Sequence, residues 1–362
     1  MKLSIVNKNK LVNNSQFWID FNELTNKLDR LPQLSSDWLI PFINHRLSDS
    51  IPLIITSYID NKLVGCLPLQ KIKKKATRYW DFTVFEFLGN GPTDFFNIPA
   101  VNDSLEIKKA LLKYFFETQK WDYLKLNLLP ENNNINPFLQ KTVVIKNAYN
   151  IKYNRSTGCH FESTNNLDKE TYYNEIFKKK NKDLLKGERR LYKDNINYHI
   201  NTYHLDVYNK FINNVKLYAE RRKTLGQYNF YEDESYCKFL KAVCDNYEKQ
   251  NSIEFSTMES DDGDVLAIQL DFIVNRVRYH WNHAFNEDYK RYSPGKILLK
   301  ELLFSSIESN CIDECNHMRG LSNYKQKFTT YTSRFINYEI ENNRSMTIKL
   351  TKLASKVLRL IR

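Results

Sequence analysis

A proline-glycine turn at the start of an expected helix is the first feature of this chain that could do chemistry. The turn reads Tyr292-Ser293-Pro294-Gly295-Lys296, and apolar residues continue after it as a helix to residue 308. The first N–H groups of a helix lack partners within it and carry the positive end of its dipole, so they can hold a phosphate. Ser293, Gly295 and Lys296 are therefore predicted to bind a phosphate-bearing ligand. The alternative is an ordinary Pro-Gly helix start.

Two histidines lie on the strand expected just before this turn, over 277–285. Strict alternation along a strand puts His280 on one face and His283 on the other, so that only one of them lines a given cleft. An imidazole with the ordinary pKa near 6.5 can accept a proton at neutral pH. His283 is the candidate base because it is nearer the turn, a structural or surface histidine being the alternative. Asp271, on the preceding strand, either orients an imidazole or holds an amine, or is a common salt-bridged carboxylate.

The elements that must position these residues form a β-β-β-α-β succession. Strands are predicted over 253–258, 265–274 and 277–285, a helix over 295–308 and a further strand over 311–318. Helices are expected upstream, over 169–193, 208–222 and 232–250. The first half shows a related order, with a hairpin over 51–69, a strand at 84–88, a helix at 105–118 and a strand at 123–128. The predicted domains are residues 1–160, 161–345 and a separate C-terminal helix over 346–362.

Several short motifs occur together in this order. They are Gly65-Cys66-Leu67-Pro68-Leu69, Phe87-Leu88-Gly89 followed by Thr93-Asp94-Phe95, a basic helix ending in Arg189-Arg190-Leu191, the turn at 292–299, and Gly320-Leu321-Ser322-Asn323-Tyr324-Lys325. Each motif is weak alone. Together they resemble the CelD-like or BioF-like acetyltransferases of the GNAT superfamily over most of the chain.

This resemblance implies an α/β (α+β) fold of tandem GNAT domains, each a mixed, mostly antiparallel sheet flanked by helices. It implies transfer of an acyl group from acetyl-CoA or another acyl-CoA to an amine, such as a nucleotide- or lipid-linked amino sugar in cell-surface polysaccharide synthesis. Ser293, Gly295, Lys296 and Lys325 would then bind the CoA phosphates. Tyr324 would protonate the departing thiolate, the alternative being a core aromatic residue.

One position departs from the family pattern. The family usually has an aspartate a few residues before the glycine of the last motif, where this chain has Asn316 beside His317. A role that needs a carboxylate there is in doubt. Two other interpretations therefore stay open. One is a FemABX-like enzyme of the same tandem fold that takes aminoacyl-tRNA, and the other is a non-catalytic basic module that binds a membrane or nucleic acid.

The charge of the chain favours an anionic partner. The 362 residues carry a net charge of +12, although an abundance of Lys, Asn and Ile also fits a simple compositional bias. A basic helix over 169–193 could contact RNA, but it lacks the interleaved aromatic residues typical of single-strand binding. The segment 346–362 has an apolar stripe among Lys and Arg residues, which predicts a helix on an anionic membrane or one docked on protein.

The cysteines and the lack of long apolar segments predict a protein of the reducing cytoplasm without a zinc site. The six cysteines form no CxxC pair, and Cys311 and Cys315 have no second half-site for zinc. The first residues contain no apolar stretch of the signal-peptide type, and no apolar run approaches about 20 residues. We therefore expect a cytoplasmic location, with contact at the inner face of the membrane through 346–362.

Overall fold

The structure, a computed structural model, describes residues 1–7, 11, 15–26, 31–47, 50–75, 80–142, 148–163, 168–320, 323–329 and 331–361. They divide into two compact units. The first unit holds Met1–Ser156 and Arg334–Arg362, and the second holds Thr157–Ser333. This division differs from the predicted domains, because residues from 334 onward return to the first unit. The reason is strand β12 (Tyr331–Asn342), which pairs antiparallel with β5 (Tyr123–Pro130).

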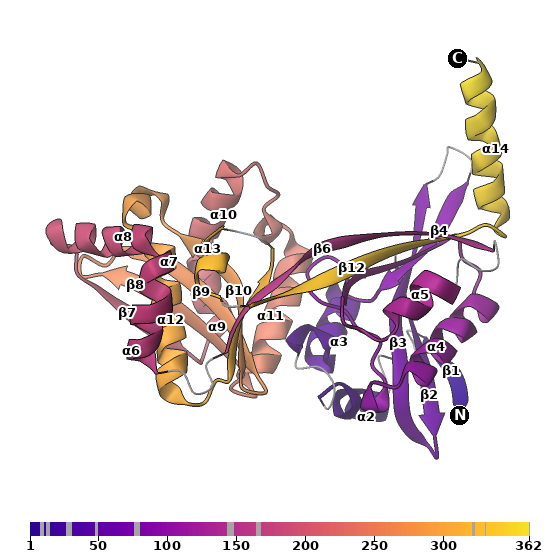
Figure 1. Cartoon of the computed structure of the whole chain (residues 1–362), viewed down its shortest axis with the longest axis horizontal. Coiled ribbons are helices and arrows are strands. Elements are labelled where there is room, and N and C mark those ends of the chain that lie inside the picture. The colour runs from indigo at the N-terminus through magenta and orange to yellow at the C-terminus, as the bar shows by residue number, and fades with distance from the viewer. Residues whose placement is uncertain are drawn as a thin grey trace. The chain divides into compact units, whose positions relative to one another are not determined.

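The first unit is a mixed sheet in the order β1-β2-β3-β4-β5-β12, with helices packed on it (Figure 1). Helices α2 and α4 both contact β3. Its remaining elements are β1 (Lys2–Asn7), α2 (Ser15–Asn26), a 3-10 turn (Pro32–Leu34), α3 (Ser36–His45), β2 (Ile51–Ile59), β3 (Lys62–Lys75), β4 (Asp81–Phe87), a 3-10 turn (Val101–Asp103), α4 (Leu105–Thr118), α5 (Asn136–Thr142) and α14 (Met346–Ile361). In the described part of the chain, no helix is long and apolar enough to span a membrane.

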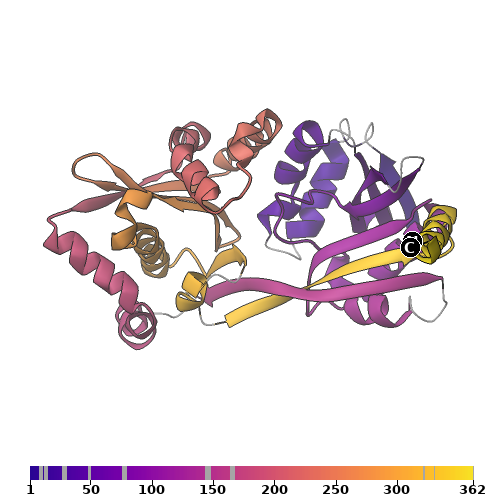
Figure 2. The same cartoon turned by 90° about the horizontal axis from the view of Figure 1, so that it is seen from above.

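The second unit is also a mixed sheet, in the order β6-β11-β10-β9-β8-β7. Figure 2 shows α10 and α11 on one side of this sheet and α12 on the other. Its elements are β6 (Tyr149–Ser163), which enters from the first unit, α6 (Lys169–Tyr172), a π turn (Tyr173–Phe177), α7 (Lys178–Lys180), α8 (Lys182–Lys193), β7 (Tyr198–Tyr203), α9 (Val207–Asn213), α10 (Val215–Thr224), a 3-10 turn (Phe230–Glu232), α11 (Glu234–Glu248), β8 (Ile253–Ser260), β9 (Val265–Val274), β10 (Val277–Phe285), a 3-10 turn (Glu287–Tyr292), α12 (Pro294–Ser309), β11 (Glu314–Arg319) and α13 (Asn323–Lys327).

Each unit contains a parallel strand pair joined by a helical crossover. In the first unit, β4 and β5 are parallel and α4 connects them; in the second, β10 and β11 are parallel and α12 connects them. Parallel neighbours cannot be joined by a tight turn, so the connecting helix must cross a face of the sheet. The predicted β-β-β-α-β succession is confirmed, and the crossover carries the 293–296 turn to the end of β10.

Helix α12 is buried on nearly all sides, with Ile297, Leu298 and Leu303 fully inaccessible. A helix whose apolar side chains are buried on most sides belongs to a core. Its start is therefore held by packing.

Two predicted helices are interrupted. The segment 169–193 contains a π turn and breaks at Asn181, whose φ of −114° and ψ of 38° are not helical. The buried Asn181 side chain donates to the carbonyls of Phe177 and Lys327, which holds the break in place. The segment 208–222 likewise divides into α9 and α10 at Asn214.

Candidate functional site

A β-bulge at Trp281 determines how the two histidines of β10 point. His280 pairs with Asp271 on β9, whereas His283 pairs with Gln269, so one extra residue is accommodated between them. Asp271 and Gln269 are two residues apart and share a face, and their partners must share it too. The expectation that His280 and His283 lie on opposite faces is therefore wrong. Both border one small internal void, with Gln269, Leu299, His317, Tyr324 and Lys325.

Asp271 is a buried carboxylate within a charged network. It is 1% exposed and accepts hydrogen bonds from Gln269 (2.7 Å), His280 Nδ1 (3.0 Å) and Arg278 (3.2 Å). Burial alone would raise its pKa, but His280 and Arg278 hold that pKa below the usual range. Conversely, burial opposes the charge on His280, yet Asp271 raises the pKa of His280 to about 9. Asp271 thus orients an imidazole, that of His280.

His283 is connected to this network by a side-chain amide. Its Nδ1 lies 3.0 Å from Gln269 Oε1, and the Gln269 amide nitrogen binds Asp271. Burial of the ring, followed by the positive charge of Arg221, lowers the pKa of His283 to about 3. The ordinary pKa assumed from the sequence does not apply, because the fold buries this ring and brings cationic groups to it. At neutral pH His283 is a neutral imidazole.

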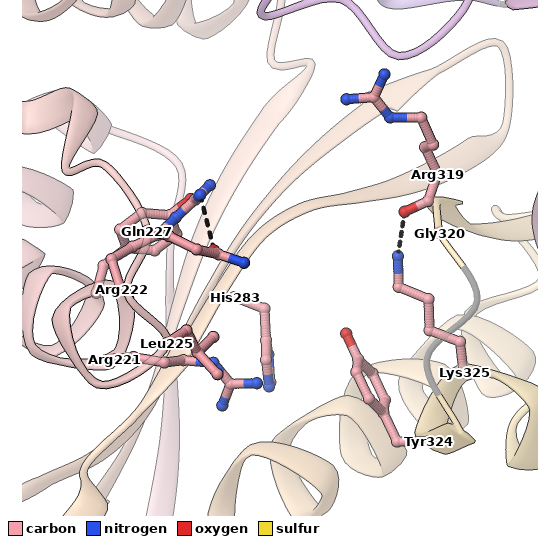
Figure 3. Close-up of a pocket in the computed structure, with 10 residues that line it drawn as sticks. Arg221, Arg222, Leu225, Gln227, His283, Arg319, Gly320, Tyr324 and Lys325 are labelled. Carbon is pink, nitrogen blue, oxygen red and sulfur yellow. Dashed lines mark hydrogen bonds between the residues drawn. The ribbon is translucent and has the colours of Figure 1, made fainter.

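A cavity of about 410 Å³ lies beside His283 in the second unit. Its lining comes from α10 and the segment after it, from β10, and from the region between β11 and α13: Tyr218, Arg221, Arg222, Leu225, Gln227, His283, Arg319, Gly320, Tyr324 and Lys325. Figure 3 shows the Tyr324 ring opposite His283 with its hydroxyl directed into the space between the labelled residues. The two rings are stacked with centroids 6.0 Å apart. The structure thus brings three predicted residues, His283, Tyr324 and Lys325, to one cavity.

The cavity is lined by four cationic side chains and by no carboxylate among its described residues. Arg221 stacks over the Phe285 ring at 4.5 Å. Arg222 donates to Tyr218 Oη and to Gln227 Oε1, and Lys325 donates to the Arg319 carbonyl at 2.8 Å. These contacts, made with an aromatic ring, a hydroxyl, an amide and a carbonyl, fix the directions of Arg221, Arg222 and Lys325. The cavity therefore suits an anionic group.

The predicted phosphate-binding turn is packed against protein. A Cβ on Gly295 would lie 2.5 Å from His283 Nε2, and one on Gly187 of α8 would lie 2.2 Å from the Tyr292 carbonyl oxygen. Lys296 forms an ion pair with Asp183. The N–H groups of Lys296 and Ile297 both donate to the Ser293 carbonyl. Phosphate binding by this turn would thus depend on the Gly295 N–H and on Ser293, neither of which lines the described cavity.

Asn316 is 3% exposed, and its amide oxygen accepts from the backbone N–H of Met318 at 2.9 Å. Met318 has a positive φ of 56°, so the Asn316 amide stabilises a strained bend before Arg319. Of the predicted motif 320–325, Leu321 and Ser322 lie outside the described residues. Within the described residues, no group of three or more His, Cys, Asp or Glu side chains could hold a metal ion.

Sequence reasoning did not identify Gln269 or Arg319. Gln269 lies two residues before Asp271 on the same face of β9, which is the one signal that could have indicated it. Arg319 adjoins Gly320, but nothing in its spacing separates it from the chain's many other cations.

Comparison with known proteins agrees with this architecture. Residues 178–326 match the family model described as an acetyltransferase (GNAT) domain, which includes every residue of the cavity. No curated protein sequence matches the chain.

Several solved structures share the fold over nearly the whole chain. A crystal structure of FemX aligns with a TM-score of 0.63 and 10% identity, covering 98% of this chain and 99% of that one. A protein of unknown function from Bacteroides thetaiotaomicron aligns with a TM-score of 0.51 and 10% identity, covering 92% of this chain and 99% of that one. A tandem GNAT protein from the clavulanic acid biosynthesis pathway aligns with a TM-score of 0.50 and 9% identity, covering 95% of this chain and 100% of that one. The fold of this chain is therefore a tandem GNAT fold, and residues 178–326 are the segment that matches the GNAT domain model.

Proposed function

We propose that the second unit transfers an acyl group from acyl-CoA to an amine, with the reaction at the cavity beside His283. The observation that carries this proposal is the meeting of His283 and Tyr324 with four cations in one cavity of the GNAT-matched segment. A volume of about 410 Å³ lies within the range of small-molecule sites. By the family resemblance, the acceptor is an amino sugar linked to a nucleotide or a lipid.

The cations would bind the phosphate groups of the donor. Arg221, Arg222 and Arg319 offer planar guanidinium groups, which recognise phosphate by paired hydrogen bonds. Lys325, predicted from the sequence as a phosphate ligand, lies on the same cavity wall.

The reaction exchanges one bond at the thioester carbon, removes a proton from the amine and supplies a proton to the thiolate. The amine nitrogen attacks the thioester carbonyl carbon, a C–N bond forms and the C–S bond breaks. His283 accepts a hydrogen bond from the attacking amine, and because of its lowered pKa the proton then passes to water. The Tyr324 hydroxyl supplies a proton to the leaving thiolate. Asp271 acts behind His283 through Gln269 and does not touch the substrate.

Thermal-shift and calorimetric titration with CoA, acetyl-CoA and longer acyl-CoAs tests this function. A ligand that binds only the folded state raises its apparent stability. Two variants compare the two phosphate sites. Arg221→Ala removes a cavity cation, and Lys296→Ala removes the lysine of the turn. We expect Arg221→Ala to weaken acyl-CoA binding about tenfold or more, and Lys296→Ala to leave it within about threefold.

Lys290→Ala provides the control, since Lys290 is exposed and pairs locally with Glu287. If Lys296→Ala weakens acyl-CoA binding and Arg221→Ala does not, the donor phosphates bind at the Ser293–Lys296 turn and not in the cavity. If no CoA species binds, the acyl-CoA proposal is wrong, and the non-catalytic role and the RNA-dependent role remain to be tested.

A second candidate function uses aminoacyl-tRNA as donor, as implied by the resemblance to FemABX enzymes. The observation that favours it is the exposed face of α8. Leu184, Gly187 and Leu191 are buried, whereas Lys182, Lys186, Arg189 and Lys193 are exposed. Such a row of cations can follow a phosphate backbone.

We also propose that α14 contacts an anionic membrane at its inner face. Ile348 is 1% exposed and Thr351 accepts a hydrogen bond from Trp80, so this side of the helix packs on the first unit. Leu350 and Leu353 of the predicted apolar stripe are instead exposed, at 45% and 59%. The side chains from residue 355 onward lie outside the described residues.

A further inference from the structure

We propose that Gln269 fixes His283 in the neutral tautomer with its proton on Nδ1, and that Asp271 in turn fixes the orientation of Gln269. Neither step depends on the reaction. The inference nevertheless deepens the proposed function and rests on it in one respect, because it names Nε2 as the nitrogen that can accept a hydrogen bond from the amine.

The argument begins at Asp271, which is ionised. Its carboxylate oxygens accept from a guanidinium, Arg278, and from His280 Nδ1, and Arg278 is also paired with Glu254 at 3.0 Å. An ionised carboxylate has no proton to donate. Any further partner of Asp271 must therefore be a donor.

That further partner is Gln269, and this decides which end of its amide faces which neighbour. Amide nitrogen and oxygen are alike in shape and are distinguished by their hydrogen bonds. Because only the NH2 group can donate, it must face Asp271 Oδ1 at 2.7 Å. The amide oxygen is thereby directed to His283 Nδ1, 3.0 Å away.

The amide oxygen is an acceptor only, so His283 Nδ1 must carry the proton. Groups around the ring then decide whether Nε2 carries a second one. Burial of the ring, then Arg221 from α10, protonated His280 on the same strand and Lys325 from α13 disfavour it, whereas Asp271 favours it. The other close neighbours are Tyr324, His317 and the start of α12 at Gly295, a positive helix end. The ring is thus neutral, with the lone pair on Nε2.

Histidine nitrogens report this directly by NMR. In protein with 15N-labelled histidine at pH 7, long-range 1H–15N spectra separate a protonated from an unprotonated ring nitrogen. The chain has seven histidines, and the signals missing in His283→Asn identify those of His283. We expect Nδ1 to be protonated and Nε2 unprotonated in the unaltered protein. The opposite assignment would overturn the proposal without any variant.

Two variants test the role of Gln269, and a third is the control. In Gln269→Leu the Nδ1 proton loses its acceptor. We expect the ring to stay neutral and its one proton to be on Nε2 in most molecules. In Gln269→Glu, a carboxyl group protonated toward the ionised Asp271 keeps its other oxygen facing Nδ1, and we expect it to restore the original tautomer. Gln70→Leu is the matched control, because Gln70 is a buried strand glutamine that donates to Glu86 at 2.7 Å in the first unit.

An unchanged His283 tautomer in Gln269→Leu, with the other histidine signals in place, would exclude a positioning role for Gln269. The same change in Gln70→Leu would assign the effect to general destabilisation and also contradict the proposal. None of these spectra requires acyl-CoA, so failure here is separate from failure of the proposed function.

Discussion

His283 lies between Arg221 and the start of α12 at Gly295, and both disfavour a second proton on its imidazole. At this site a neutral ring has an advantage. In the proposed reaction it would accept a hydrogen bond from the amine without adding to the positive charge that would hold the anionic donor. As a consequence, acid favours the unfolded chain, in which this ring can take up a proton that the folded state disfavours.

Stability should therefore depend on His283 below pH 6.5. The pKa of this group is about 6.5 when unfolded and about 3 when folded, so the unfolded chain binds the proton first and stability falls as the pH drops through this range. In His283→Asn this loss is absent. Between pH 7 and 4.5, urea unfolding should show the variant losing about 2 kcal/mol less stability than the unaltered protein. His199→Asn, at an exposed position, is the control. Equal losses in all three proteins would exclude a lowered pKa at His283.

Gly295 should tolerate no side chain while His283 keeps its position. A Cβ there would lie 2.5 Å from Nε2, so Gly295→Ala must displace the ring from Gln269. We expect a loss of about 1–3 kcal/mol in urea unfolding. The double variant Gly295→Ala/His283→Ala removes the clash and should show a favourable coupling of about 1 kcal/mol or more. Additive effects would mean that the two residues do not meet.

At the scale of elements, exposed faces of helices suggest where partners bind. Helix α8 buries Leu184 and Leu191 and exposes its lysines, whereas α14 exposes part of its apolar stripe beside Lys349 and Lys352. Apolar side chains exposed in a row next to cations are typical of helices that lie in a membrane interface.

Helix α14 should thus bind anionic vesicles. Leu350→Glu/Leu353→Glu places two negative charges on the exposed stripe without altering Ile348, which anchors the helix. In co-sedimentation with vesicles containing phosphatidylglycerol, we expect the variant to lose most of the bound fraction, about tenfold or more in affinity. Thr347→Glu is the control, since it adds charge next to the anchored side. If the unaltered protein ignores these vesicles, or if Leu350→Glu/Leu353→Glu binds them equally well, α14 has another role.

At the scale of the whole molecule, the net charge of +12 attracts any polyanion, and affinity alone does not identify a substrate. The salt dependence does. CoA carries few phosphate groups that can meet the cavity, whereas a tRNA can engage many cations at once.

The affinities for the two candidate donors should therefore respond differently when the salt concentration rises from 50 to 200 mM. Non-specific tRNA binding through six or more phosphate contacts should weaken about 10³-fold or more, and CoA binding by less than about 30-fold. Fluorescence titration of both ligands across this range gives the slopes. Lys182→Ala/Lys186→Ala should reduce the tRNA slope by about two and leave CoA binding unchanged. A saturable tRNA complex that survives 200 mM salt, with no CoA binding, would favour the aminoacyl-tRNA function.

The sequence by itself determined most of the secondary structure around the site. Strands 265–274 and 277–285 were predicted at their observed limits, and the helix after the turn was predicted to within one residue at each end. These elements are long and strongly patterned, and the turn and helix-start residues between them act locally. The tandem GNAT fold was also predicted from the order of short motifs, because each motif is a run of neighbouring residues that can be recognised without the tertiary structure.

Only the tertiary structure decided what the residues of the site do. Strict alternation placed His280 and His283 on opposite faces, but pairing with β9 inserts a bulge at Trp281 and puts both on one. The pKa of His283 depends on burial of the ring and then on Arg221, a residue 62 positions earlier that folding brings close. The return of β12 to β5 likewise joins residues more than 190 positions apart. Register, burial and charge proximity are properties of pairs distant in sequence, so no local pattern of residues specifies them.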